Sequence, residues 1–167
     1  MKNLLQKLPF LANLQTNSIY PFVSEAEFSM HHVLEELLNI TGSAAVKVSS
    51  FSISETALRC FYRLSEQGVI TEMQCLLDIS VKRHKLGLLF FANNTGIEVS
   101  LVKNHAKLIF IKNDTWSIVI VGSANLQEND KNETGVICTG YDIYQYFENN
   151  FSNWFNKGLK VTADEFN

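Results

Sequence analysis

The sequence predicts an α/β fold, an α-β-α sandwich in which helices cover both faces of a mixed β-sheet. Three observations predict it. Helix-like and strand-like segments alternate between residues 24 and 103, two β-rich runs flank the turn-forming pair Asn113-Asp114, and aromatic residues recur at helical spacing near the C-terminus. A chain of 167 residues, of which 46% are hydrophobic, is long enough for one domain with a sizeable core.

Residues 1–23 contain both prolines of the chain and show little periodicity beyond a short helix over Leu4–Leu14. We expect this segment to be a leader that packs on the domain or on a partner. A capping-box pattern, Ser24-x-x-Glu27, then predicts the start of a helix that ends at Gly42. The main domain is expected to span residues 24–158, and residues 159–167 form a polar tail.

Strands and helices alternate in the next part of the chain. A second capping-box pattern, Ser52-x-x-Glu55, predicts a helix that ends at Gly68. The expected strands are Ala44–Phe51, Val69–Ile79 and Ile97–Lys103, with a further helix over Ser80–Asn93. This βαβαβ order predicts parallel strands joined by right-handed crossovers.

The C-terminal third is expected to contain a hairpin and a helix. The hairpin strands begin at His105 and at Thr115, and a short apolar run follows at Thr134–Gly140. A final helix from Tyr141 to about Asn156 carries an aromatic stripe, which we expect to face the core. The stripe consists of Ile143, Phe147, Phe151, Trp154 and Phe155.

Charge is distributed unevenly along the chain. The net charge is −3, but residues 79–112 contain six basic residues and one acidic residue, so this segment is +5 and the rest is −8. Such a segment suits a phosphodiester ligand, although Lys82–Lys85 can equally be a solvated basic helix face. The basic residues are Lys82, Arg83, Lys85, Lys103, Lys107 and Lys112.

The three cysteines, Cys60, Cys75 and Cys138, each lie in an apolar run and predict buried free thiols in a reducing compartment. None has the spacing to a histidine that a metal site needs, so we expect no metal and no cofactor. No run approaches the roughly 18 apolar residues of a membrane span. We therefore expect a cytoplasmic protein with no stable membrane insertion.

Polar residues able to act on a phosphodiester cluster around the hairpin. His105 and Lys107 are two apart on a predicted strand, so their side chains should point to the same face. The second strand ends in Gly122-Ser123-Ala124-Asn125, and Glu133 lies eight residues after Asn125. A nucleophile or base, a cation, hydroxyl and amide donors and a carboxylate therefore converge, as a phosphoryl-transfer site requires.

This set resembles the phospholipase D superfamily, whose signature is HxKxxxxD followed by GSxN and a downstream acidic residue. His105-x-Lys107, Gly122-Ser123-x-Asn125 and Glu133 match it in order. Lys112 stands where the family has Asp, and the nearest carboxylate is Asp114. The match covers roughly the C-terminal third, with a compatible βαβ pattern before it. The resemblance implies a phospholipase D-like domain acting as a metal-independent, nuclease-like phosphodiesterase through a phosphohistidine.

The chemistry assigns a role to each candidate. A neutral His105 imidazole can attack phosphorus, while Lys107, Asn125 and Ser123 hold the developing charge and Glu133 fixes the His105 tautomer. One imidazole cannot also protonate the leaving oxygen in the same step, so a homodimer that joins two copies of the site is expected. The candidate substrate-binding residues are Ser123, Lys103, Lys82 and Arg83, and the candidate substrate is DNA or RNA.

A second hypothesis keeps the fold and removes the activity. In this alternative, the domain is catalytically degenerate and binds nucleic acid or a protein partner. A phospholipid substrate is disfavoured because no amphipathic helix with a basic face is evident, although the Leu-rich leader keeps it open. Replacing His105 by Ala separates enzyme from binding module, because only the enzyme loses its function.

Overall fold

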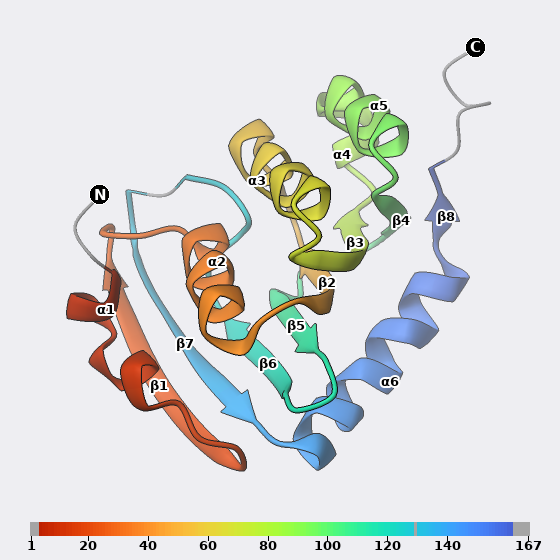
Figure 1. Ribbon diagram of the computed structural model, residues 1–167. Coiled ribbons are helices and arrows are strands. Elements are labelled where there is room, and N and C mark those ends of the chain that lie inside the picture. The colour runs from red at the N-terminus through yellow and green to blue at the C-terminus, as the bar shows by residue number, and fades with distance from the viewer. Residues whose placement is uncertain (1–3, 129, 162–167) are drawn as a thin grey trace.

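The structure is a computed structural model that describes residues 4–128 and 130–161. Its centre is an eight-stranded sheet with the order β1-β7-β6-β5-β2-β3-β4-β8 (Figure 1). The β2–β3 and β3–β4 pairs are parallel and the other pairs are antiparallel, which confirms the predicted mixed sheet. The strands are β1 (Ser18–Glu25), β2 (Ala44–Ser50), β3 (Ile70–Asp78), β4 (Glu98–Val102), β5 (Leu108–Lys112), β6 (Ser117–Gly122), β7 (Asn132–Thr139) and β8 (Leu159–Lys160).

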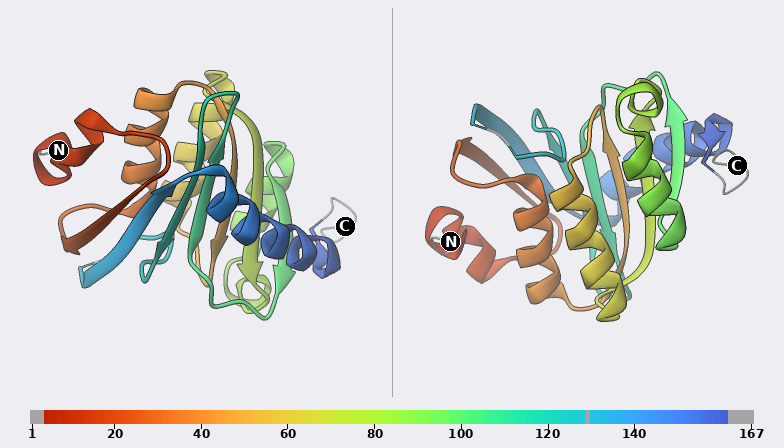
Figure 2. Two further views of the ribbon diagram at one scale, coloured as in Figure 1. Left: turned by 90° about the horizontal axis from the view of Figure 1, so that it is seen from below. Right: turned by 90° about the horizontal axis from the view of Figure 1, so that it is seen from above.

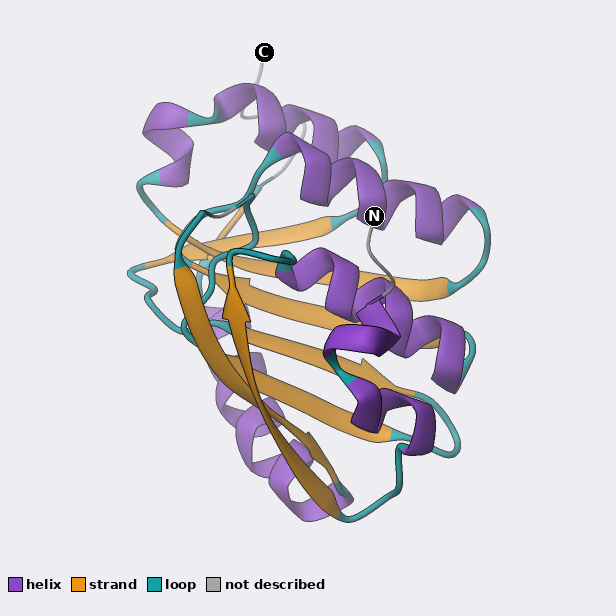
Figure 3. Ribbon diagram, turned by 90° about the vertical axis from the view of Figure 1, so that its left-hand side faces the viewer, coloured by secondary structure: helices purple, strands orange, loops and turns teal. Residues whose placement is uncertain are grey.

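Helices cover both faces of this sheet (Figures 2 and 3). One face carries α1 (Leu4–Lys7), the 3₁₀ helix η1 (Pro9–Asn13), α2 (Met30–Thr41), α3 (Glu55–Glu66), α4 (Val81–His84) and α5 (Leu86–Asn94). The other face carries α6 (Tyr141–Lys157). The predicted α-β-α sandwich is therefore confirmed.

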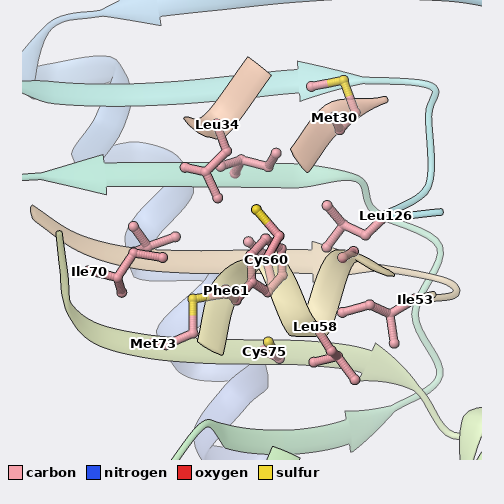
Figure 4. Packing of buried hydrophobic residues seen from close by; sticks show 14 of the residues in the cluster. Met30, Leu34, Ile53, Leu58, Cys60, Phe61, Ile70, Met73, Cys75 and Leu126 are labelled. Atoms are coloured by element: carbon pink, nitrogen blue, oxygen red, sulfur yellow. The ribbon is translucent and has the colours of Figure 1, made fainter. Parts of the chain in front are cut away.

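Successive side chains of the central strands point to opposite faces of the sheet and pack into two separate hydrophobic cores. In β5, Ile109 and Ile111 join the core under α2 and α3, whereas Leu108 and Phe110 join the core under α6. This is the period-two pattern expected of a strand buried on both faces. Within the larger core, α3 lays its apolar side chains against β2 and β3 (Figure 4). The predicted cysteine burial is confirmed, because all three thiols are free and buried.

Both predicted capping boxes are wrong in position. Ser24 belongs to β1, where it pairs with Glu133 of β7, and α2 begins only at Met30 with Ser29 as its N-cap. Likewise α3 is capped by Ser54, which accepts a hydrogen bond from Ala57 N (3.2 Å). Long-range pairing of β1 with β7 outweighs the local capping signal at Ser24.

Several boundaries also differ from the sequence expectation. Residues 18–23, expected in the leader, form most of β1. The helix expected over Ser80–Asn93 is divided into α4 and α5 at Lys85 (φ −140°, ψ 39°), whose ammonium turns inward to Ser52 Oγ (2.8 Å) and Ile53 O (2.6 Å). At the expected polar tail, residues 159–160 form β8, and residues 162–167 lie outside the described residues.

Candidate functional site

The candidate residues converge at one edge of the sheet. The parallel strands β2, β3 and β4 all end there, and β5 begins there because Leu108 pairs with Ser49 of β2. Antiparallel pairing then brings the end of β6 and the beginning of β7 to the same edge, since Gly122 pairs with Gly135. The carboxyl ends of parallel strands are where open α/β sheets commonly bind ligands.

His105 and Lys107 meet at this edge, although not on a strand. They lie in the irregular segment Lys103–Lys107, and β5 starts only at Leu108, so the predicted strand position is wrong. Their side chains nevertheless come together, with Lys107 Nζ 3.0 Å from His105 Nδ1 and 2.6 Å from His105 O. The exposed His105 ring also packs beside the Phe51 ring, with centroids 5.6 Å apart.

Ser123, which follows the last residue of β6, Gly122, links the end of this strand to Glu133. Its hydroxyl donates to Glu133 Oε2 and accepts from Thr134 N (3.1 Å), while Ser123 N donates to Thr134 O (3.0 Å). A side chain at Gly122 would put a Cβ 3.2 Å from Thr134 O, so the close approach of the two strands favours glycine. The predicted hydrogen bond between Glu133 and His105 stays a prediction.

Burial and Glu133 act in opposite directions on Lys107. Burial lowers the pKa of the Lys107 ammonium below its usual value, and the nearby Glu133 carboxylate partly restores it. Lys107 therefore lies within the field of Glu133 while its ammonium contacts His105. The cation, the imidazole, the carboxylate and the Ser123 hydroxyl form one electrostatic unit.

Asn125 is held by the loop that follows β2. Ser50 Oγ lies 3.3 Å from Asn125 Oδ1 and accepts from Leu126 N (3.1 Å), and Ser54 N donates to Leu126 O (2.8 Å). With its oxygen turned to Ser50, Asn125 offers its amide nitrogen as a donor. The motif residues on the β6–β7 loop are thereby fixed against β2.

Sequence reasoning missed two residues that hold the segment Lys103–Lys107 in place, Asn104 and Asp78. The buried Asn104 side chain donates to Ser49 Oγ (3.0 Å), Ser50 O (3.1 Å) and Leu76 O (3.3 Å), and it accepts from Ala106 N (3.1 Å). Its backbone N–H donates to Asp78 Oδ2 (2.9 Å). The sequence offers one sign of this role: Asn104 is a polar residue between an apolar strand and His105.

Asp78 remains charged despite its position under the loop. Burial by itself would raise the Asp78 pKa, but hydrogen bonds from Ser80 and from the backbone of Asn104 and Ile79 outweigh it, and the pKa is below the usual value. Asp78 also accepts from Ser80 N (2.9 Å), so it joins the start of α4 to the segment that carries His105.

The missing motif carboxylate would not reach the site. Lys112 ends β5 and lies about 17 Å from Lys107 along an extended chain, at the opposite edge of the sheet. Asp114 is exposed in the turn beyond it. Asn113 anchors that turn instead, donating to Thr41 O (2.9 Å) and accepting from Trp116 N (2.8 Å).

The candidate substrate-binding cations are distributed along the same edge. Lys103 lines a cavity of about 330 Å³ together with His105. Lys82 and Arg83 lie on α4, which follows the Asp78 turn, and Arg83 is exposed. Lys85 differs from them because its ammonium is bound to the β2–α3 loop, and burial lowers its pKa.

Among the described residues, no group of three or more His, Cys, Asp or Glu side chains is arranged to hold a metal ion. In the same part of the chain, no helix is long and apolar enough to cross a membrane.

Known structures share this fold. Nuc from Salmonella typhimurium, a phospholipase D family member, superimposes with a TM-score of 0.70 at 16% identity, over 87% of this chain and 99% of that one. NucT from Helicobacter pylori gives 0.65 at 16% identity, over 85% and 99%. TrmBL2, an archaeal chromatin protein with a novel mode of DNA binding, gives 0.61 at 13% identity, over 93% and 60%.

No protein-family model matches the sequence, and no curated protein matches it. Identities of this size establish a shared fold. The predicted phospholipase D-like fold is therefore confirmed, and the activity has to be argued from the site itself.

Proposed function

We propose that this protein is a metal-independent phosphodiesterase of nuclease type that acts as a homodimer. The observation that carries the proposal is the convergence of His105, Lys107, Ser123 and Glu133 at the ligand-binding edge of a phospholipase D-like sheet. The fold of Nuc and the DNA binding of TrmBL2 support a nucleic-acid substrate.

The proposed reaction has two steps. In the first, an unprotonated His105 nitrogen attacks phosphorus, the bond to the leaving oxygen breaks, and His105 of the partner subunit gives that oxygen its proton. In the second, water attacks the phosphohistidine, loses a proton to the partner's His105, and releases the phosphate product. Lys107 and the amide of Asn125 stabilise the charge that develops on the non-bridging oxygens.

The homodimer follows from the number of available imidazoles. His31 is buried, His32 is bound to the Ser29 backbone in the capping box of α2, and His84 lines a separate cavity with Glu55 and Arg59. His105 is therefore the histidine that the site itself offers, and a two-fold assembly supplies the second.

The test is cleavage of plasmid and single-stranded DNA in EDTA by the wild type, His105→Ala and His84→Ala. We expect cleavage by the wild type and His84→Ala and none by His105→Ala. Cleavage by all three would remove His105 from the mechanism. Binding of DNA without cleavage by any of them would favour the degenerate binding module.

A further inference from the structure

A cavity of about 330 Å³ opens directly beside His105, on the α6 face of the sheet. Its walls come from two parts of the chain: the segment Val102–Ala106 and the last turn of α6, which supplies Trp154 and Lys157. His105 thus contacts Lys107 and also forms part of the wall of this cavity. Whatever occupies the cavity lies next to the group that His105 attacks.

Trp154 is not buried in the core, so the prediction that the whole aromatic stripe faces the core is wrong at this residue. Phe151 and Phe155 are buried, whereas the Trp154 side chain is 39% exposed. The reason is helical geometry, because Trp154 is displaced from the stripe that Phe151 and Phe155 form toward the sheet. Its indole is therefore available to a ligand in the cavity.

The cavity is held in shape by the end of α6. Ser100 Oγ donates to Phe155 O (2.7 Å), and Gly158 N donates to Trp154 O (3.0 Å). A Cβ at Gly158 would clash with Ser100 Oγ and lie 2.8 Å from a Val102 methyl group, so α6 ends in direct contact with β4. Trp154 and Lys157 are thereby fixed opposite the His105 segment, as in a preformed ligand site.

The side chains that line the cavity indicate which class of ligand fits it. Among the described residues, the lining offers an aromatic face, two lysines, Lys103 and Lys157, and no carboxylate side chain. An exposed indole beside cations is the combination by which proteins bind the bases and phosphates of single-stranded nucleic acid. A volume at the lower end of ligand pockets suits one planar base.

We propose that this cavity binds an unpaired nucleobase next to the scissile phosphate, with Trp154 stacking on the base and Lys103 and Lys157 holding the flanking phosphate. The preferred substrate is then single-stranded nucleic acid, because a base in a duplex must be unstacked and unpaired before it can enter. This inference rests on the proposed function, whose site it shares.

Binding of two 12-mers tests the inference without relying on cleavage, using His105→Ala protein throughout. One probe is oligothymidylate, and the other is an abasic tract with the same phosphates. Trp154→Ala should weaken oligothymidylate binding about 5- to 150-fold and leave abasic binding unchanged, since stacking is sequence-tolerant but needs a base. Trp154→Phe should restore most of the loss. Tyr146→Ala, which removes another exposed α6 aromatic, serves as the control.

A second readout covers the case in which Trp154→Ala does not fold. In a Trp116→Phe protein, Trp154 is the single tryptophan, and oligothymidylate should quench its fluorescence whereas the abasic tract should not. Equal effects on the two probes, or no binding of oligothymidylate, would overturn the inference. Failure of the proposed function would appear differently, as His105-independent cleavage or as probe binding without cleavage by the wild type.

Discussion

The ammonium of Lys107 lies 3.0 Å from Nδ1 of His105. The same ammonium donates a hydrogen bond to the backbone oxygen of His105 (2.6 Å), so Lys107 holds the His105 segment as well as facing its ring. In the proposed reaction, the phosphate oxygens compete for this ammonium, and Lys107 stabilises their charge.

Replacing Glu133 by Gln should shift the pH dependence of cleavage. Burial lowers the Lys107 pKa and Glu133 raises it, so removing the carboxylate lowers that pKa further. Activity that needs the Lys107 ammonium is lost as pH rises through its pKa. We therefore expect the alkaline limb of kcat/KM to move to lower pH in Glu133→Gln. An unmoved limb would show that another group governs it.

Asn104→Ala should reduce both stability and activity. The substitution leaves buried acceptors at Ser50 and Leu76 without their donor, a loss of about 1–3 kcal/mol in the free energy of unfolding, and it releases the His105 loop. Urea denaturation and kcat/KM measure the two effects. Asn149→Ala, at an exposed position on α6, should change each by little, and matching losses in the two variants would contradict the anchoring role.

Restoring the family's carboxylate with Lys112→Asp should not raise the cleavage rate. Position 112 lies at the opposite end of β5 from His105, and Asn113 already anchors the hairpin. We expect kcat/KM to stay within about twofold, because a surface change away from the site has little effect. A rise of tenfold or more would mean that the displaced Asp limits this site.

Stability should depend on the protonation of His31. This side chain is buried on α2, and its Nδ1 has no hydrogen-bond partner among the described residues. Burial, with a smaller contribution from His32, lowers the His31 pKa to about 4, and Glu35 opposes the shift. The unfolded chain therefore binds the proton at a higher pH than the folded protein does.

The free energy of unfolding should consequently fall as pH decreases from 6.5 to 4, by up to about 3 kcal/mol. Urea titrations at several pH values measure this slope. His31→Leu should flatten it, while His84→Ala should leave it unchanged. A slope that persists in His31→Leu would assign the dependence to other groups.

Hydrophobic periodicity and turn residues predicted the elements whose formation depends mainly on nearby residues. The βαβαβ order, the hairpin and α6 follow from periodicity and turn residues, and the structure confirms them. The position of β1 could not be predicted in this way, because it depends on pairing with β7, more than 100 residues away in the chain. The two misplaced capping boxes show the same limit.

The same limit applies to the candidate site, where the sequence reveals some residues and not others. The sequence motif identifies four residues that the structure brings to one edge of the sheet: His105, Lys107, Ser123 and Glu133. Asn104 and Asp78 act through contacts with distant strands, which no spacing reveals. The aromatic stripe includes both Trp154 and Phe155, but consecutive helical residues point about 100° apart, and only Phe155 of this pair is buried.

The proposed mechanism makes His105 the nucleophile. The most direct measurement is mass spectrometry of peptides from an acid-free, denaturant-quenched reaction of the wild type with a single-stranded oligonucleotide in EDTA. We predict a nucleotide adduct on the peptide that contains His105, and its absence in His105→Ala. Cleavage with an adduct on another residue, or cleavage that persists in His105→Ala, would show that His105 is not the nucleophile.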